Sequence, residues 1–479
     1  MLRINDTLDG ERVFEPLEPP KVRMYVCGIT PYDRMHVGHL RTYVFFDVVR
    51  RYLEYLGYEV MYVQNITDIE DKVFRRAKEL GIHPLDLTRK NMEIALKEMD
   101  RVNIRRPDIL AAVSDNIPAI QRLIGKIMER GYAYEAGGDV YFSVRKFKDY
   151  GKLSKQKLDQ LIAGARIEPG EHKRDPLDFV LWKAEKEGEL VYDSPWGRGR
   201  PGWHIECSAI SMKYLGETID IHGGGRDLIF PHHENEIAQS EAATGKRFVR
   251  YWMHTGFLTI NGEKMSKSLG NFITVGDLLD RHDPNAVRLY LLSVHYRSPI
   301  DFKDEYVEEA AANLERIRAA LEFARVAMEE DGSDTSLDEA IRKEKANFIN
   351  SMDNDFDTSG ALAALNALVH EVNKAAHNLN TKREVMQRAV DTVYEFLSIL
   401  GIEVKLMKDS KILPGLKGLA KEYGIEGDDV HTIVSGLLER RAEARKRKDF
   451  ETADKIRSQL IQCGIIVEDF GGRSTWRRK

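Results

Sequence analysis

The pattern of apolar and polar positions near the N-terminus predicts a strand, a helix and a second strand. Val22 to Cys27 is a short apolar run with β-branched residues, which is typical of a buried strand. From Gly38 to Leu56 apolar residues recur at helical spacing, and Gly57 follows as a stop signal. Glu59 to Gln64 predicts the second strand. This βαβ unit implies a parallel sheet that binds ligands at the carboxyl ends of its strands.

The rest of the pattern predicts an α/β catalytic domain of Rossmann type with an insertion, followed by an α-helical bundle and a small C-terminal domain. The insertion contains a predicted strand, Asp139 to Val144, and the parallel sheet resumes near Trp203. Pro231 is well placed to begin a helix in that second half. After about Asp301 helical spacing dominates, and its apolar face is typical of a bundle core. The predicted segments are the first half of the catalytic domain (1–116), the insertion (117–200), the second half (201–250), a linking segment (251–303), the bundle (304–408) and the C-terminal domain (409–479).

The C-terminal domain is predicted to follow a linker, Asp409 to Gly415. Two helices are predicted within it, Asp429 to Lys446 and Phe450 to Cys463, and then a short strand, Ile465 to Glu468. From Arg440 onward 12 Lys and Arg stand against six Asp and Glu, although the whole chain has a net charge of −5. A basic end on an acidic body indicates local contact with a polyanion. The alternative is a solvated helix face with a frayed tail.

The composition is that of an ordinary globular protein, with 42% hydrophobic and 31% charged residues. No apolar run approaches the length of a membrane span, and the charged N-terminus lacks the apolar core of a signal peptide. The three cysteines predict free or metal-bound thiols in a reducing compartment. We therefore expect a cytoplasmic protein that contacts no membrane.

Two short signatures lie far apart in the chain. The first, His36-Val37-Gly38-His39, opens the predicted helix, where free backbone N–H groups and the helix dipole favour phosphate. The second is Lys264-Met265-Ser266-Lys267-Ser268, whose two lysines can stabilise a pyrophosphate leaving group. Taken singly, each has an ordinary alternative: a pair of surface histidines, or a solvated basic loop. Together, and in this order, they indicate a site that binds the phosphates of ATP.

Four further residues form a candidate zinc set: Cys27, Cys207, His232 and Glu236. Thiolate, imidazole and carboxylate groups are the ligands that zinc takes in proteins. His232 and Glu236 are four residues apart and would share one face of a helix. The spacing of the cysteines indicates little by itself, because lone cysteines are often small buried apolar residues.

The chain resembles the class I aminoacyl-tRNA synthetases through both signatures, and among them the cysteinyl-tRNA synthetases. The stretches that carry the closer resemblance are Tyr25 to Gly28, Gly202 to Ala209 (GWHIECSA) and Asp220 to Glu236 (DIHGGGRDLIFPHHENE). In that family the positions of the candidate zinc set hold a zinc ion that binds the substrate cysteine. The resemblance also implies that Thr67 and Trp203 line the amino-acid pocket and that Asp227 lies near the substrate ammonium group. The implied ATP-handling positions are His36, Gly38, His39, Gly223, Gly224, Gly225, Lys264 and Lys267.

The resemblance implies a cysteine–tRNA ligase that uses ATP with Mg²⁺ and one zinc ion, with L-cysteine and tRNA-Cys as partners. The bundle and the C-terminal domain would bind the tRNA, the latter at the anticodon, and we expect a monomer. Trp476, which lies among arginines, is a candidate to stack on a base. One alternative is a ligase that joins activated cysteine to an amino-sugar, although such enzymes lack the C-terminal tRNA-binding domain. Another is a non-catalytic relative, which the intact signatures disfavour.

Overall fold

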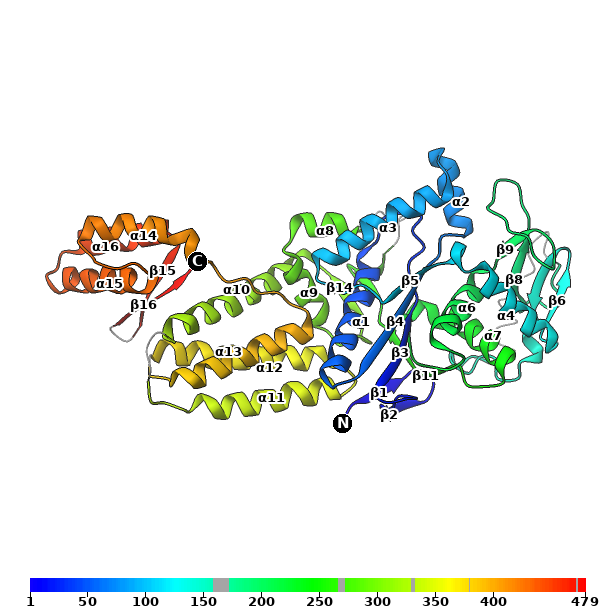
Figure 1. Ribbon diagram of the computed structural model, residues 1–479, viewed down its shortest axis with the longest axis horizontal. Helices are drawn as coiled ribbons and strands as arrows, with labels where there is room; N and C mark the ends of the chain where they lie inside the picture. The colour runs from blue at the N-terminus through cyan, green and yellow to red at the C-terminus, as the bar shows by residue number, and fades with distance from the viewer. Residues whose placement is uncertain (158–171, 266–271, 329–331, 379, 471–472) are drawn as a thin grey trace. The chain divides into compact units, whose positions relative to one another are not determined.

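The computed structural model describes residues 1–157, 172–265, 272–328, 332–378, 380–470 and 473–479. Contacts within the chain divide it into two compact units (Figure 1). Unit 1 comprises Met1–Val307 and Met352–Thr358, and unit 2 comprises Glu308–Ser351 and Ser359–Lys479.

A five-stranded parallel sheet forms the centre of unit 1. The helix α1 (Val37–Tyr55) follows the central strand and is buried along most of its length, because it packs on the sheet and on α8 (Val275–Arg281) and α9 (Pro284–Leu292). The predicted strand, helix and strand are confirmed to within two residues at each end. The strand order is β11 (Val249–Thr255), β10 (Ile219–Gly225), β3 (Lys21–Val26), β4 (Glu59–Ile66) and β5 (Ile109–Ala112).

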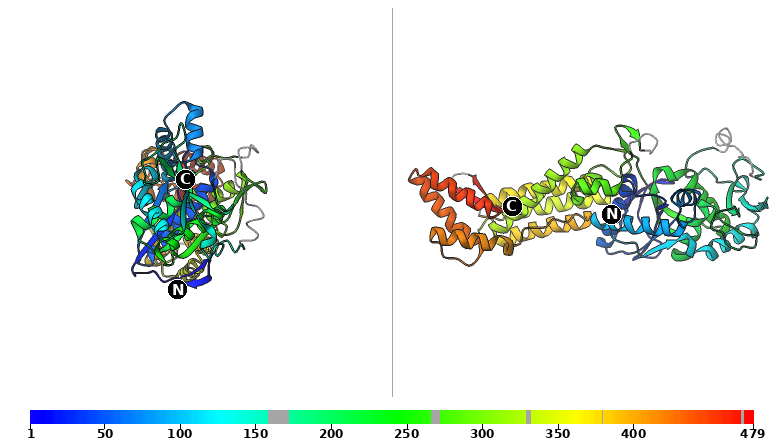
Figure 2. Two further views of the ribbon diagram at one scale, coloured as in Figure 1. Left: turned by 90° about the vertical axis from the view of Figure 1, so that its right-hand side faces the viewer. Right: turned by 90° about the horizontal axis from the view of Figure 1, so that it is seen from above.

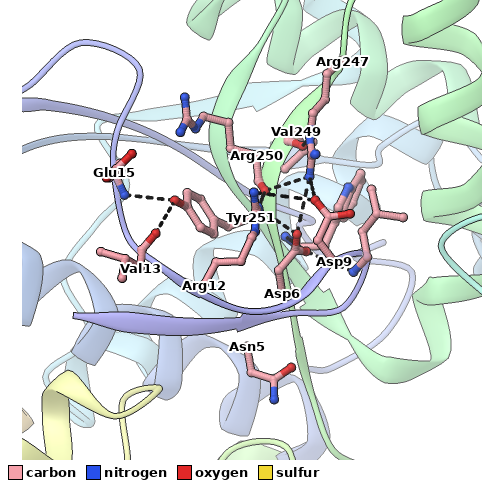
Figure 3. A network of polar contacts seen from close by, with 12 residues as sticks. Asn5, Asp6, Asp9, Arg12, Val13, Glu15, Arg247, Val249, Arg250 and Tyr251 are labelled. Atoms are coloured by element: carbon pink, nitrogen blue, oxygen red, sulfur yellow. Dashed lines mark hydrogen bonds and ion pairs between the residues drawn. The ribbon is translucent and has the colours of Figure 1, made fainter. Parts of the chain in front are cut away.

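An N-terminal hairpin packs on the edge strand β11 (Figure 3). It consists of β1 (Arg3–Asp6) and β2 (Gly10–Val13). The buried carboxylate of Asp6 accepts a hydrogen bond of 2.9 Å from the backbone N–H of Trp252, and the hydroxyl of Tyr251 donates to a carbonyl of β2 at 2.8 Å. These bonds hold β11 in place, and the carboxyl end of β11 takes part in the candidate site.

The elements between β4 and the second half of the sheet include two helices, the edge strand β5 and an insertion. Two helices, α2 (Asp71–Leu80) and α3 (Pro84–Arg101), connect β4 to β5. The predicted strand at Asp139 is β7 in an antiparallel sheet that leads into α6 (Trp203–Leu215). The elements of this insertion are α4 (Ile117–Glu129), β6 (Ala133–Ala136), β7 (Asp139–Phe142), β8 (Phe179–Ala184) and β9 (Gly199–Pro201).

The helix predicted to begin at Pro231 begins later. An irregular turn covers Ile229–His233, and α7 spans Glu234–Thr244. Phe230 has an extended conformation (φ −136°, ψ 132°), because a residue that precedes proline is disfavoured from the helical region. His232 therefore lies in the turn before the helix, while Glu236 lies in its first turn.

The chain continues from β11 into a small second sheet. Its strands, in spatial order, are β13 (Glu263–Lys264), β12 (Leu258–Ile260) and β14 (Ile300–Phe302). Lys264, the first residue of the lysine signature, therefore lies on a strand whose backbone pairs with β12.

Long helices that lie side by side follow the second sheet and continue into unit 2 (Figure 2). The predicted apolar face of the first of them is buried at Ile317, Leu321 and Ala324. Within the described ranges, none of the helices combines the length and the apolar character needed to cross a membrane. The bundle consists of α10 (Asp304–Ala327), α11 (Leu337–Asp353), α12 (Thr358–Asn378) and α13 (Arg383–Leu400).

The C-terminal part of unit 2 has one helix and one strand more than predicted. The segment expected to be a linker is the first half of α14 (Asp409–Tyr423), because Ile412 and Leu416 occupy one helical face and are buried in the core of this part. The expected helices and strand are present, and a second strand completes a hairpin. These elements are α15 (Val430–Lys446), α16 (Phe450–Gln462), β15 (Ile465–Phe470) and β16 (Arg473–Arg478).

The expectation that Trp476 stacks on a base is wrong for this structure. Its side chain is 3% exposed and lies in the same core, on β16. The guanidinium of Arg478 lies 5.1 Å from the centre of its ring and also pairs with Asp409 at 2.6 Å. The sequence pattern misled because a large aromatic ring gains more by burial in a core than by exposure beside charges.

Candidate active site and metal centre

A cavity of about 350 Å³ opens at the carboxyl ends of the parallel strands. Cys27 and Gly28 follow β3, Thr67 follows β4, and Gly225 and Thr255 end β10 and β11. Ligands bind at this edge of open α/β sheets. The other residues lining the cavity are Thr30, Tyr32, His36, Gly38, His39, Thr42, Tyr43, Asn65, Lys72, Trp203, Cys207, Asp227, Leu228, His232, Gly256, Phe257, Leu258 and Met265.

The four residues of the candidate zinc set converge at one end of this cavity. Their ligand atoms all lie within 4.8 Å of one another, and all four side chains are buried. The two sulfur atoms are 3.9 Å apart, and Nε2 of His232 lies 3.0 Å from Oε1 of Glu236. Such separations suit ligands around one ion with bonds of about 2.0–2.3 Å. The donor set thus fits zinc.

Mutual contacts set the charge of these groups. Burial raises the pKa of Cys27, and the neighbouring Cys207 and Glu236 raise it further. Burial alone would also raise the pKa of Cys207, but its contacts with Cys27 and His232 lower it to about 6. The pKa of Glu236 falls to about 2 despite burial, because His222 and His232 face it. Although burial lowers it, contacts with Cys207 and Glu236 raise the pKa of His232 to about 10, so a proton on His232 balances part of this negative charge, and a bound cation could take its place.

Histidines behind the set form a second, overlapping group with Cys27 and Glu236. His222 Nε2 lies 2.8 Å from Glu236 Oε2, and His233 Nε2 lies 3.3 Å from Cys27 Sγ. His233 in turn makes a hydrogen bond to His254 at 2.7 Å. His222 and His233 are not among the residues that line the cavity, whereas Cys27, Cys207 and His232 are. Three members of the predicted set therefore line the cavity, while the histidines behind it contact Cys27 and Glu236, as side chains that orient metal ligands do.

These two histidines were missed from the sequence. His233 directly follows a predicted ligand, and His222 precedes the glycine run. Asn65 and Lys72 were also missed: both line the cavity, and Asn65 donates to the hydroxyl of Thr67 at 3.0 Å. Their position near the carboxyl end of β4 is the signal that could have identified them.

The first signature forms the start of α1. His36 caps the helix, and the rings of His36 and His39 stack with 3.6 Å between their centres. Burial, and secondarily His36, holds the pKa of His39 well below 6.5, so His39 is neutral at pH 7. A Cβ on Gly38 would lie 3.0 Å from the His36 ring, so glycine leaves room at this turn. Two imidazoles, of which His39 is neutral, and a helix N-terminus thus border the cavity, an arrangement suited to phosphate oxygens.

The second signature is described only in part. Met265 lines the cavity, and the backbone N–H of Val37 donates to Ile273, which brings the segment after the signature to the start of α1. Of Lys264 the backbone is described, in β13, and Lys267 lies outside the described residues. Their assignment to ATP therefore stays a prediction.

The remaining predicted residues divide between the cavity and its support. Gly225, Asp227, Thr67 and Trp203 line the cavity, and the Trp203 ring lies 4.6 Å from that of His232. Gly223 and Gly224 do not line it. A Cβ on Gly223 would lie 2.1 Å from the ring of Phe46, so this glycine permits α1 to pack closely on β10.

Solved structures of other proteins share this fold. The structure is similar to methionyl-tRNA synthetase of Mycobacterium tuberculosis bound by methionyl-adenylate, with a TM-score of 0.61 and 17% identity over 86% of this chain and 96% of that one. It is also similar to a leucyl enzyme of Agrobacterium radiobacter in a ternary complex, LeuRS-tRNA-LeuAMS (TM-score 0.59, 12% identity, 81% and 85% covered). At these identities the likeness shows the fold alone, which is that of a class I aminoacyl-tRNA synthetase.

The sequence identifies the particular family. The model of the class I (C) catalytic domain of tRNA synthetases matches residues 13–312, a DALR domain matches 347–405, and the anticodon binding domain of cysteinyl-tRNA ligase matches 428–477. The chain is 49% identical to the cysteine–tRNA ligase of Thermococcus gammatolerans, over 100% of this chain and 99% of the relative. It is 45% identical to that of Aquifex aeolicus, with the same coverage. The chain belongs to the cysteinyl-tRNA synthetase family.

Proposed function

We propose that this chain joins L-cysteine to tRNA-Cys in two steps. The carboxylate oxygen of cysteine attacks the α-phosphorus of ATP bound with Mg²⁺, which forms cysteinyl-adenylate and releases pyrophosphate. The 2′-hydroxyl of the terminal adenosine of the tRNA then attacks the carbonyl carbon, loses its proton and displaces AMP. The observation that carries the proposal is that one cavity holds both a thiol-binding donor set and the histidine signature, in a chain that matches this family over its whole length.

The metal end of the cavity selects the amino acid. A zinc ion held by the predicted set would bind the substrate as a thiolate, whereas a serine hydroxyl is far harder to ionise. Thr67, which Asn65 orients, and Trp203 border the same end. The carboxylate of Asp227 also faces the cavity and is suited to the substrate ammonium group.

The other end of the cavity handles ATP. His36 and His39 donate hydrogen bonds to phosphate oxygens as charge develops on them in the transition state. Because His39 is neutral, it adds a directed donor without a fixed charge at this position. Lys264 and Lys267 are assigned to the departing pyrophosphate by their match to the family signature.

The tRNA contact in the C-terminal domain centres on the corner between α15 and α16. Arg445, Arg447 and Lys448 are exposed there, and Phe450 is 60% exposed at the start of α16. Arg445 also pairs with Asp469 at 3.1 Å, whereas an aromatic ring beside the other two exposed cations is the arrangement that stacks on a base while holding phosphates. This corner replaces Trp476 as the candidate stacking site.

The amino-sugar ligase is not favoured, because residues 428–477 match an anticodon-binding domain. Translation takes place in the cytoplasm, which is where we place the protein. We also propose that the chain acts as a monomer.

Charging of total tRNA with labelled cysteine, measured in parallel with cysteine-dependent ATP–pyrophosphate exchange, tests this function. We expect both activities and the charging of one tRNA species. Exchange without charging would contradict transfer to tRNA and favour a small amine as acceptor. Absence of both would contradict the proposal as a whole.

A further inference from the structure

Arg41 lies on α1 two residues after His39 and makes an unusual set of contacts. Its Nη1 donates to the carbonyls of Gly256 and Phe257, both at 2.9 Å. Its Nη2 donates to three carbonyls of the segment 295–298, at 2.5, 3.3 and 3.4 Å. Among the residues that the structure describes, no carboxylate pairs with it. One guanidinium therefore joins two backbone segments that are distant in sequence.

Burying this cation lowers the stability of the fold, so we look for a role in the backbone segments that it holds together. Arg41 is 2% exposed, and a buried cation without a counter-ion is unfavourable. Burial lowers the pKa of Arg41 to about 10, so the side chain keeps its charge at neutral pH. Within the described ranges, the carbonyls of Gly256 and Ser298 accept from Arg41 and from no other donor. Removing the guanidinium would leave both without a partner.

The segment that Arg41 holds is a wall of the cavity. Residues 255–258 all line it, and they continue directly into β12, which pairs with β13 and the start of the lysine signature. The hydroxyl of Thr42 makes a hydrogen bond of 2.8 Å to that of Thr255, which ties the same wall to the same helix. A Cβ on Gly256 would lie 2.4 Å from the carbonyl oxygen of Ser298, so the two segments are already in close contact.

We propose that Arg41 is a positioning residue for ATP: it fixes the wall 255–258, and the strand that leads to Lys264, relative to His36 and His39. The inference rests on the proposed function and names a determinant of its nucleotide end. The metal end is built on the end of β3, on α6, and on α7 with the turn before it, and within the described residues the hydrogen bonds of Arg41 go to none of these. Loss of the guanidinium should therefore weaken the use of ATP and leave cysteine binding unchanged.

The test compares Arg41→Lys and Arg41→Met with the wild-type protein and with a control, Arg51→Lys. Arg51 is also a buried arginine of α1, but it pairs with the carboxylate of Asp47 at 2.7 Å. Lysine at position 41 keeps the charge but carries its donors on one nitrogen, which cannot span both segments. Cysteine-dependent ATP–pyrophosphate exchange gives kcat and the KM for ATP, calorimetry without ATP gives the Kd for cysteine, and a thermal melt reports folding.

For both Arg41 variants we expect at least a tenfold loss of kcat/KM for ATP and less than a twofold change in the Kd for cysteine. Arg51→Lys should keep both values within twofold of wild type, even if its melting temperature falls. The inference is overturned if the Arg41 variants keep their kcat/KM for ATP, if cysteine binding falls in parallel, or if the control loses as much. If Arg41→Met fails to fold, Arg41→Lys alone decides between these outcomes. Absence of exchange in the wild-type protein would instead overturn the proposed function, and the inference with it.

Discussion

The metal-donor set of unit 1 and the arginine-rich hairpin of unit 2 both gather charged and polar side chains. Of the two, the donor set borders the cavity described above, whereas the described side chains of the hairpin pair with neighbours or enter a core. Around Cys207 the donor atoms converge on a small space that opens to the cavity. At the hairpin β15–β16, Asp469 pairs with Arg441 of α15, Arg478 pairs with Asp409 of α14, and Trp476 is buried in a core. A cluster of reactive residue types can act as a site only if some of its atoms are accessible from a cavity and are not all paired with protein groups. The composition of the sequence does not reveal this accessibility.

Removing a ligand from the metal set should have the largest effect. Cys207→Ser is expected to lose zinc and to lower cysteine activation at least about 100-fold, since even partners that only orient ligands contribute 10–100-fold. Elemental analysis and ATP–pyrophosphate exchange measure the two effects. Cys463→Ser, on the half-buried thiol in unit 2, is the matched control and should change neither. Full zinc content in Cys207→Ser would remove this residue from the set.

Truncating Trp476 tests whether the hairpin of unit 2 has a structural role. Trp476→Ala should destabilise the C-terminal part of unit 2 by about 3–5 kcal/mol, because it empties a core position. Thermal unfolding measures this change, and Trp476→Phe should lose much less. Adenylate formation should not change, because the cavity is built from unit 1 alone as far as the structure describes it. Reduced tRNA charging with unchanged stability would instead support the rejected stacking role.

Removing the exposed ring of Phe450 should have a smaller effect, on tRNA binding and not on stability. Phe450→Ala should weaken tRNA binding by about 1–3 kcal/mol, the contribution of one stacked base. Stability and ATP–pyrophosphate exchange should remain as in wild type. Ile461→Ala, at another exposed apolar position of the same helix (47%), is the control and should leave tRNA affinity intact. Equal effects of the two substitutions would argue against stacking by Phe450.

The smallest expected effect is the loss of folding stability when acid protonates Asp469 of the hairpin. The hydrogen bonds from Arg441 hold the pKa of Asp469 well below 3.8, so this carboxylate stabilises the folded state above about pH 4. The contribution is lost as pH falls below 4 and the folded-state group becomes protonated. At the protein surface it amounts to about 1 kcal/mol. Asp469→Asn should remove this part of the pH dependence of unfolding, and an unchanged profile would contradict the role assigned to the pair.

The sequence predicted those parts of the molecule that depend on local periodicity or on short signatures. The βαβ unit followed from helical spacing between two apolar runs, and the four candidate metal ligands followed from residue types and from resemblance. The residues that the sequence did not reveal are those whose contacts come from segments distant in the chain. His222 and His233 became visible only once β10 and α7 met behind Cys27, and Arg41 only once its five carbonyl partners were assembled. The same reason explains Trp476, whose burial depends on α14 and α15.

The most direct test of the account compares cysteine with serine in ATP–pyrophosphate exchange, before and after zinc is removed and restored. The account predicts exchange with cysteine, a loss of exchange when zinc is removed, recovery when zinc returns, and very little exchange with serine throughout. Full exchange in zinc-free protein, or similar exchange with the two amino acids, would contradict the claim that the donor set selects the substrate.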